Sequence, residues 1–206
     1  MKTYTVLIGM LLLASTFYAQ EIKNVDYVSP IHENVAAVKS GERWGFIDPN
    51  GNYAIPLRED LVIPSHTAKE MPYPYFSKDR AIFKEVRDNI DYYGYINSKG
   101  SIAIPAKYIE VSPFNEYGYA LALELFKETV GDNDLLNKPI VRYEYNEVII
   151  DTTGKAIMYT SEAKHIIPMR DQLRKTQRIT SYLRGPKLVV IKNKQGSWDI
   201  VKTIKN

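Results

Sequence analysis

The chain contains a repeated stretch, and this repeat limits how the chain can fold more than any other feature. Residues 43–56 have the sequence RWGFIDPNGNYAIP, and residues 92–105 have the sequence YYGYINSKGSIAIP. Both copies keep one order of an aromatic residue before Gly, an aromatic-Ile pair, Asp or Asn, a second Gly, and Ala-Ile-Pro. Such an ordered recurrence indicates a repeat protein, in which each unit buries its apolar surface against the next.

The first half of each copy has the pattern of a β-strand. Aromatic residues alternate with other residues and stand beside Ile, which is typical of a pleated, half-buried surface. A Gly inside such a strand predicts either a bulge or a place where another backbone or ring lies close. The equivalent residues are Trp44, Gly45 and Phe46 in the first copy and Tyr93, Gly94 and Tyr95 in the second.

A turn follows the aromatic strand in both copies. Asp48 and Asn97 can accept a hydrogen bond from the backbone ahead of them, and Gly51 and Gly100 suit a position with positive φ. A further strand is expected after the Gly. This strand should end at Pro, which cannot donate to a ladder, and the prolines concerned are Pro56 and Pro105.

Weaker copies extend the repeat to four predicted units, at residues 22–56, 76–105, 114–158 and 187–206. Each unit begins with a small-apolar strand that carries Ala36, Ala81 or Ala120 in the first three units. The third unit keeps Asp151 and Gly154 but lacks the aromatic-Gly pair, and residues 124–142 within it are expected to be a polar loop. In the fourth unit, we place Trp198 at the position of Trp44. The chain ends before the third strand of that unit, which predicts a truncated cap.

The predicted fold is therefore all-β, with tandem three-stranded antiparallel β-meander repeats in an open propeller-like or solenoid array. Sixteen tyrosines and five methionines favour sheets over helical bundles. Residues 21–206 are predicted to form a single domain, which is long enough to bury a core. The formal charge of +3 indicates no particular partner.

The first twenty residues are predicted to be a signal peptide. Lys2 precedes an apolar run at residues 6–14, and Ala19 and Gln20 lie at the expected cleavage region. An uncleaved anchor is the alternative, but the run is shorter than the roughly 20 residues that span a membrane. The chain has no cysteine, which excludes a disulfide framework. We expect an exported protein, periplasmic or extracellular, whose only contact with a membrane is through the cleaved peptide.

These motifs resemble the WG repeat family of bacterial β-repeat proteins. The resemblance rests on Trp44-Gly45-Phe46-Ile47-Asp48-x-x-Gly51 with Ile55-Pro56, and on Pro105-x-x-Tyr108 followed by Phe114-x-Glu116-x-Gly118-x-Ala120. It extends over roughly residues 27–201 and implies an all-β array in a secreted or envelope protein without shared catalytic residues. The sequence departs from the family pattern at Tyr93, at Trp198-Asp199 and in the third unit.

One segment does not follow the repeat and is predicted to be a helix over residues 168–184. Pro168 stands at its start and Gly185-Pro186 at its end, as expected for helix boundaries. At 100° per residue, an apolar face lies opposite a basic stripe. The stripe consists of Arg170, Arg174 and Arg178.

No catalytic, cofactor or metal site is predicted. No Ser, Cys or carboxylate stands in a nucleophile motif, and no Gly-rich loop opens a helix. The histidines, His32, His66 and His165, are scattered along the chain, and Asp132-Asn133-Asp134 lacks the Glu of a calcium loop. We therefore do not expect an enzyme, and an envelope hydrolase is the least favoured class.

Two functional hypotheses remain. The first is a non-enzymatic module of the cell envelope that binds a protein or a glycan. The second is a binder of an anionic polymer or surface through the basic segment 168–187, in which Arg170, Arg174 and Arg178 would be the binding residues. Export argues against nucleic acid. The aromatic-Gly pairs could form a sugar-stacking platform, but rings at strand spacing usually belong to the core.

Overall fold

The computed structural model describes residues 22–65, 71–133, 137–166, 178–193 and 195–202. Within these residues every regular element is a strand, and all pairings between named strands are antiparallel. The all-β prediction is confirmed. Residues 1–20, the predicted signal peptide, lie outside the described part of the chain. No helix in that part is long and apolar enough to cross a membrane.

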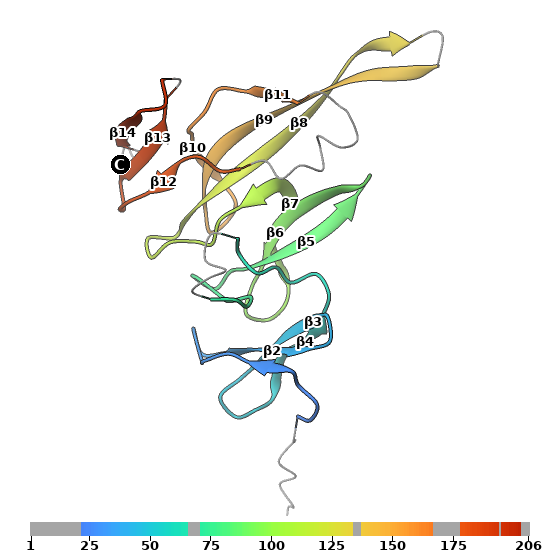
Figure 1. Ribbon diagram of the computed structural model, residues 1–206, viewed down its shortest axis with the longest axis vertical. Coiled ribbons are helices and arrows are strands. Elements are labelled where there is room, and N and C mark those ends of the chain that lie inside the picture. The colour runs from blue at the N-terminus through green and yellow to red at the C-terminus, as the bar shows by residue number, and fades with distance from the viewer. Residues whose placement is uncertain (1–21, 66–70, 134–136, 167–177, 194, 203–206) are drawn as a thin grey trace, which may run out of the picture.

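The strands form three sheets, which Figure 1 shows along the length of the molecule. The first sheet has the order β1 (Tyr27–Val28), β2 (Ala36–Ser40), β3 (Arg43–Ile47) and β4 (Tyr53–Arg58). The second has the order β10 (Ala156–Tyr159), β9 (Lys138–Asp151), β8 (Tyr119–Asn133), β7 (Ile102–Val111), β6 (Ile90–Ile96) and β5 (Ala81–Arg87), and β11 (Lys164–Ile166) also pairs with β9. The third contains β12 (Tyr182–Leu183), β13 (Leu188–Lys192) and β14 (Trp198–Lys202).

Strand register shows that the first three units are equivalent. The Ala of the first strand always lies opposite the Ile that precedes the turn, in the pairs Ala36 with Ile47, Ala81 with Ile96, and Ala120 with Ile150. The residue three positions after this Ala pairs with the position that carries the aromatic residue of the aromatic-Gly pair in the first two units. These pairs are Lys39 with Trp44, Lys84 with Tyr93, and Leu123 with Glu147.

The turns of the repeat have one geometry, as the sequence predicts. The Asp48 carboxylate accepts hydrogen bonds from the backbone N–H groups of Asn50 and Asn52, both at 2.9 Å. Asn97, Asn115, Asp151 and Asn193 accept the equivalent pair of bonds. Each turn ends in a Gly of positive φ, with values of 82° at Gly51, 78° at Gly100, 79° at Gly118, 82° at Gly154 and 83° at Gly196.

The prediction that Pro56 and Pro105 end their strands is wrong. Both lie inside a strand, where the register shifts between β3 and β4 and between β6 and β7. A bulge accommodates Pro because a bulged residue does not have to donate to the ladder. The Gly of the aromatic-Gly pair lies opposite this bulge. A Cβ on Gly45 would stand 2.8 Å from the Ile55 carbonyl oxygen, so the close approach requires Gly.

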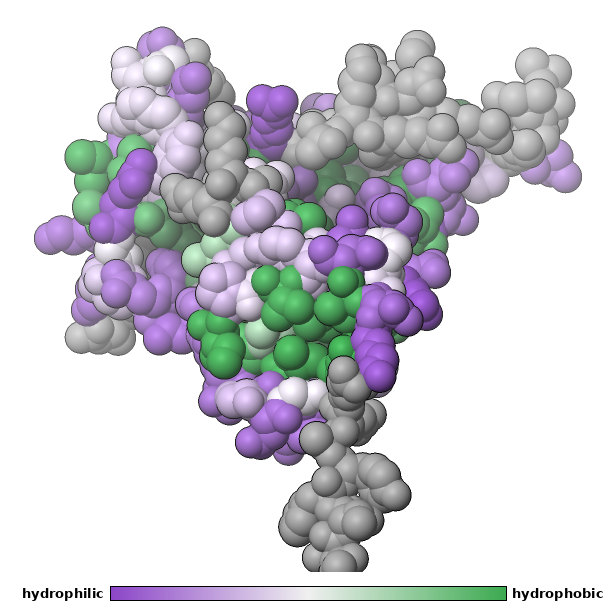
Figure 2. All heavy atoms as spheres, turned by 60° about the horizontal axis from the view of Figure 1, so that its bottom comes forward, coloured by the Kyte–Doolittle hydropathy of each residue, from purple (hydrophilic) through white to green (hydrophobic). Residues whose placement is uncertain are grey.

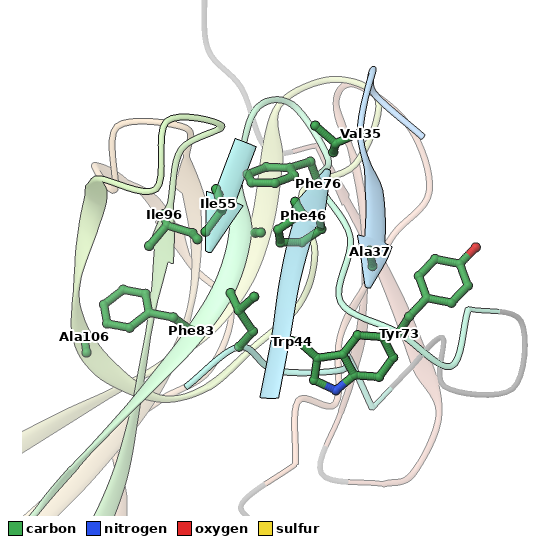
Figure 3. Close-up of a cluster of buried hydrophobic side chains, with 12 residues drawn as sticks. Val35, Ala37, Trp44, Phe46, Ile55, Tyr73, Phe76, Phe83, Ile96 and Ala106 are labelled. Atoms are coloured by element: carbon green, nitrogen blue, oxygen red, sulfur yellow. The ribbon is translucent and has the colours of Figure 1, made fainter. Parts of the chain in front are cut away.

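Neighbouring units pack through two contacts that recur. The ring of Phe46 lies 4.7 Å from Phe76, which precedes the second unit, and Tyr95 lies 4.8 Å from Phe114, which precedes the third. Figure 3 shows Phe46 and Phe76 side by side in the buried cluster of the first two units. The turn of each following unit also covers the preceding Ile. Gly100 lies against Ile55, and Gly154 lies against Ile104.

Residues 124–142 are not a polar loop. Most of them belong to β8 and β9, which pair from Tyr119 and Asp151 to Asn133 and Lys138 and form the long arm seen in Figure 1. The loop prediction rested on the polar side chains of this segment. These side chains are compatible with strands here because the arm is largely exposed on both faces, with Phe126 and Val130 more than 40 % exposed. A two-stranded ribbon without a buried face does not show the usual alternation of apolar and polar residues.

The predicted helix over residues 168–184 is also corrected. Residues 167–177 lie outside the described residues, whereas residues 178–184 are not helical and include β12. Two tertiary contacts explain this outcome. Glu147 binds the backbone N–H groups of Thr180 and Ser181, and β12 pairs with β13. Such contacts override a local helical preference.

The fourth unit differs from its prediction in its strands. Lys192 pairs with Trp198 across the Asn193 turn, as Ile47 pairs with Tyr53 across the Asp48 turn. Trp198 therefore occupies the position of Tyr53, and the prediction that it replaces Trp44 is wrong. The unit comprises β12, β13 and β14, so its third strand is present and its first strand begins before residue 187.

Candidate functional site

Most of the predicted arginine stripe lies outside the described residues. Arg170 and Arg174 lie outside the described residues, and Arg178 is exposed in a segment that is not helical. The candidate site that the structure does present is formed by the residues that follow Arg178.

Glu147 fixes the beginning of that segment. Its carboxylate accepts hydrogen bonds from the Thr180 N–H at 2.9 Å, the Thr180 hydroxyl at 2.9 Å and the Ser181 N–H at 2.8 Å. Only 1 % of Glu147 is exposed. A buried carboxylate is costly unless several donors satisfy it, and hydrogen bonds to a charged acceptor are about twice as strong as neutral ones. Glu147 therefore holds the fourth unit against the third.

Register explains why the third unit lacks an aromatic-Gly pair. Glu147 occupies the position of Trp44 and Tyr93, and Val148 occupies the position of Gly45 and Gly94. In the first unit, this position holds a buried indole that packs edge-on against Tyr27, with ring centroids 5.9 Å apart. In the third unit, the same position holds a carboxylate that binds backbone N–H groups. A ring contact within the first unit is thus replaced, at this position of the third unit, by hydrogen bonds to the fourth unit.

The third sheet has one buried face and one exposed face. Val189 is fully buried, and Leu183 and Ile191 pack with it against Leu121 and Ile149 of the third unit. Directly paired residues point to the same side of a sheet. The opposite side therefore carries the pairs Tyr182 with Val190, Val190 with Ile200, and Lys192 with Trp198.

We call this exposed side the aromatic face and define it by Tyr182, Lys192, Trp198 and Ile200. Tyr182 and Trp198 are each 47 % exposed, and Ile200 is 70 % exposed. The two rings lie 5.3 Å apart at an interplanar angle of 57°. This contact orders both rings without covering them, because nearly half of each side chain remains accessible.

Two cations lie over these rings. The Arg184 guanidinium is 5.1 Å from the centre of the Tyr182 ring, and the Lys192 ammonium is 5.8 Å from the Trp198 ring. Among the described residues, no carboxylate lies within salt-bridge distance of either cation. Residues 178–202 carry one acidic residue, Asp199, and the basic residues Arg178, Arg184, Lys187, Lys192, Lys194 and Lys202. The surroundings of the aromatic face are therefore basic.

A second apolar surface lies at the other end of the molecule. Figure 2 shows apolar side chains gathered at the end that carries the first sheet. Val28 and Ile31 are 49 % and 61 % exposed there. Ala36 and Val38, which lie on the same sheet, are almost completely buried. Tyr27 is also 36 % exposed at this end. The ring with an overlying cation in the first sheet is that of Trp44, which Lys39 contacts, and Trp44 is buried. Among its described residues, this end therefore has no exposed ring with an overlying cation.

The remaining predicted repeat positions have structural roles. Trp44, Gly45 and Gly94 are buried, and Tyr93 is half-buried. Burial raises the pKa of the Tyr93 hydroxyl to about 12, and the nearby Glu110 carboxylate adds to this effect. Burial also raises the pKa of Glu110 to about 7, and a hydrogen bond from the Ser65 hydroxyl at 3.4 Å offsets this rise only in part. Glu110 stands in a strand without a motif, so its sequence context does not mark it.

The titratable residues that the sequence analysis considered do not form a cluster in the described part of the chain. No group of three His, Cys, Asp or Glu side chains comes together there as metal ligands. His165 contacts Glu144 at 3.0 Å on the surface of the arm. His32 lies beside Tyr75 at the other end of the molecule, and His66 and Asp134 lie outside the described residues.

The recurring turns, the common strand register and the three antiparallel sheets define an all-β repeat protein. Residues 44–58 and 93–124 match the family described as WG containing repeat. The resemblance predicted from the aromatic-Gly pairs is thus confirmed over these segments, which begin at the aromatic-Gly pairs of the first and second units and reach the start of β8. No curated protein and no solved structure matches the chain.

Proposed function

We propose that this protein is an exported, non-enzymatic interaction module of the cell envelope that binds a protein partner on its aromatic face. The observation that carries this proposal is the joint exposure of Tyr182, Trp198 and Ile200 on one side of the last sheet. Trp, Tyr and Arg provide most of the binding energy in protein interfaces. In this proposal the repeats form an open array whose last unit presents the binding surface.

A protein partner suits the aromatic face better than a glycan. Ile200 is the most exposed member of the face, and it lies two residues from Trp198 on the same side of β14. Covering an aliphatic side chain requires an apolar surface on the partner, because the gain comes from apolar area removed from water. Arg184 and Lys192, which have no carboxylate partner among the described residues, then favour acidic groups around the apolar centre of the partner surface.

Export is supported by Lys2, by the apolar run at residues 6–14 and by Ala19-Gln20 at the expected cleavage region. An exported module meets envelope proteins, not cytoplasmic ones. Binding of an anionic polymer is the second candidate function, because six basic residues accompany one acidic residue in segment 178–202. The two candidate functions differ in the side chains that supply most of the binding free energy. Binding of a polymer depends on the basic residues, whereas binding of a protein depends on Trp198 and Ile200.

The experiment uses the protein without residues 1–20 as bait on envelope proteins of the source bacterium. A captured protein is purified, and its affinity is measured by calorimetry for the wild type and for the double variant Trp198→Ala/Ile200→Ser. We expect the variant to lose at least about tenfold in affinity, as hot-spot truncations do. The control is Ile102→Ala, which removes a 61 % exposed side chain at the equivalent position of the second unit.

Three results would contradict the proposal of a protein partner. The first is equal affinity of the double variant and the wild type for the purified partner. The second is selective retention by an acidic polysaccharide that persists in the double variant and disappears between low and physiological salt, which would favour the polymer candidate. The third is binding of a neutral glycan that depends on Trp198, which would identify the aromatic face as a sugar site.

A further inference from the structure

A cleft lies where the fourth unit meets the third. It encloses about 380 Å³ and lies between the segment before β8 and the segment that leads into β12. This volume falls within the range of about 300–1,000 Å³ that is usual for small-molecule sites. The residues used below to argue its chemistry are Asn115, Leu121, Ile179, Ser181, Leu183 and Arg184.

The walls of the cleft are apolar on both sides. Leu121 is buried on the side of the third unit, and Ile179 and Leu183 pack in the same cluster on the side of the fourth. The position of Ile179 and Leu183 depends on Glu147, which binds the backbone between them at Thr180 and Ser181. The cleft is therefore held open by a buried interaction and offers a hydrophobic surface to a ligand.

The polar groups of the cleft are mainly donors. The Arg184 guanidinium has no carboxylate within salt-bridge distance among the described residues, and guanidinium groups only donate. The side-chain oxygen Oδ1 of Asn115 already accepts hydrogen bonds from the backbone N–H groups of Tyr117 and Tyr119. The side-chain N–H₂ of Asn115 is therefore the group that can donate to a ligand. Among the described residues, those that line the cleft include no acidic one.

Ser181 adds an unsatisfied hydroxyl at this place. The residue is 3 % exposed, and its Oγ has no hydrogen-bond partner in the described part of the chain. A buried hydroxyl without a partner is destabilising, and an acceptor supplied by a ligand removes this cost. The backbone N–H of Ser181 is already bound to Glu147, so the hydroxyl is the free group.

We propose that this cleft binds a carboxylate that is attached to a short apolar group. Such a ligand accepts hydrogen bonds from Arg184, Asn115 and Ser181, and its apolar part packs between Leu121 and Leu183. The C-terminal residue of a peptide and a free acylated amino acid share this chemistry. The proposal goes beyond the proposed function. Arg184 lies over Tyr182 of the aromatic face, and both residues also line the cleft, whereas Trp198 and Ile200 are not among its lining residues.

The test compares two probes that differ in charge alone. N-acetyl-leucine carries a carboxylate, and N-acetyl-leucine amide replaces it by a neutral carboxamide. Binding to the protein without residues 1–20 is followed by backbone amide shifts in nuclear magnetic resonance. We expect saturable shifts at residues 112–121 and 179–184 for the acid, and at least about tenfold weaker binding of the amide, since charge-assisted bonds are roughly twice as strong as neutral ones.

Variants identify the donors. Arg184→Gln should weaken binding of N-acetyl-leucine about tenfold, while Lys192→Gln, which changes a nearby cation outside the cleft lining, should not change it. Ser181→Ala should weaken binding by a smaller factor. The amide spectrum of each variant shows whether it is folded, and because Arg184 is exposed its replacement is compatible with folding.

Two outcomes would overturn the proposal. One is the absence of saturable shifts in these segments for the acid, and the other is equal binding of acid and amide in a folded protein. Comparison of free N-acetyl-leucine with a peptide that ends in leucine distinguishes the two ligand sources. The double variant Trp198→Ala/Ile200→Ser should bind N-acetyl-leucine like the wild type, so failure of the aromatic face and failure of the cleft are separate results.

Discussion

Gly94 faces the carbonyl oxygen of Ile104 across the bulge of β7, and a Cβ on Gly94 would stand 2.5 Å from that oxygen. The Ala106 nitrogen and the Phe83 ring are also within 2.8 Å of the same point. Two of these neighbours are backbone atoms in a paired strand, so they cannot move as a flexible side chain would. The Gly of the aromatic-Gly pair is thus needed for space between strands.

The first prediction follows from this crowding. Gly94→Ala should lower the free energy of unfolding by about 1–3 kcal/mol, since overpacking forces the backbone to shift. Gly131→Ala is the matched control, because Gly131 also lies in a strand but has no atom within 4 Å of a Cβ and no positive φ. Urea unfolding measures both variants. Equal stabilities would show that the bulge yields without cost.

The second prediction concerns the turns. Gly51 has a φ of 82° and open space around a Cβ, so only backbone conformation opposes a side chain there. Gly51→Val should destabilise the protein by about 1–3 kcal/mol, because β-branched residues adopt this conformation with strain. Asn52→Val, at an exposed neighbouring position, should cost less. Thermal melting of the two variants decides, and identical melting temperatures would contradict the predicted role of the turn.

The third prediction concerns Glu147. Glu147→Ala should destabilise the protein by about 2–4 kcal/mol, because it leaves the donors of Thr180 and Ser181 without their acceptor. Hydrogen exchange should show loss of protection in residues 178–183 before the first sheet is affected. Glu144→Ala, on the same strand, removes a contact to an exposed His165 and should cost about 0–1 kcal/mol. Unchanged protection of 178–183 would contradict the prediction.

The fourth prediction concerns pH. The pKa of Glu110 is raised from 4.5 to about 7, so the folded protein binds this proton more tightly than the unfolded chain. The stability from this group is present at low pH and is lost as the pH rises through about 7. Glu110→Gln should therefore be more stable than the wild type at about pH 8, by on the order of 1 kcal/mol, and the difference should disappear near pH 5.

Urea unfolding at both pH values tests this expectation, with the exposed Glu42→Gln as the control. A constant difference between wild type and Glu110→Gln at the two pH values would show that Glu110 does not titrate in this range. A stability difference that is larger at the lower pH would mean that the pH dependence has the opposite sign. This result would exclude a pKa of Glu110 that is raised by burial.

The fifth prediction concerns export. The protein isolated from its source should begin near Gln20, because the apolar run at residues 6–14 is predicted to be a signal peptide. Mass spectrometry of the native amino terminus, together with cell fractionation, measures this. An intact Met1 in a cytoplasmic fraction would contradict it.

The sequence predicted the parts of the fold that depend on local chemistry. Asp48 and Gly51 predict their turn because the hydrogen bonds and the positive φ lie within five residues. The prediction that Pro56 ends its strand is wrong because the bulge that accommodates Pro56 requires Gly45 on the neighbouring strand. A residue on another strand leaves no mark in the sequence around Pro56. The prediction for Trp198 is wrong because it equates Trp198 with Trp44 by residue type. The register is set by the Asn193 turn, which places Trp198 at the position of Tyr53.

The candidate sites were less predictable for the same reason. Glu147 and Thr180 are 33 residues apart, and no local pattern marks a carboxylate whose partners are distant backbone groups. The exposure of Trp198 also depends on which side of the third sheet packs against Leu121. A strand sequence does not determine this when Ile191 and Ile200 make both sides apolar.

The contacts of Gly100 with Ile55 and of Gly154 with Ile104 have a consequence for modular engineering and for gene duplication. A transplantable cassette cannot begin at the first residue of a strand, because Phe76 and Phe114 in the preceding connecting segments stack on the unit before them. The natural cassette runs from a connecting segment to the end of the following bulged strand. An additional copy cut at those boundaries would bring its own ring and its own turn to the neighbour that it must cover.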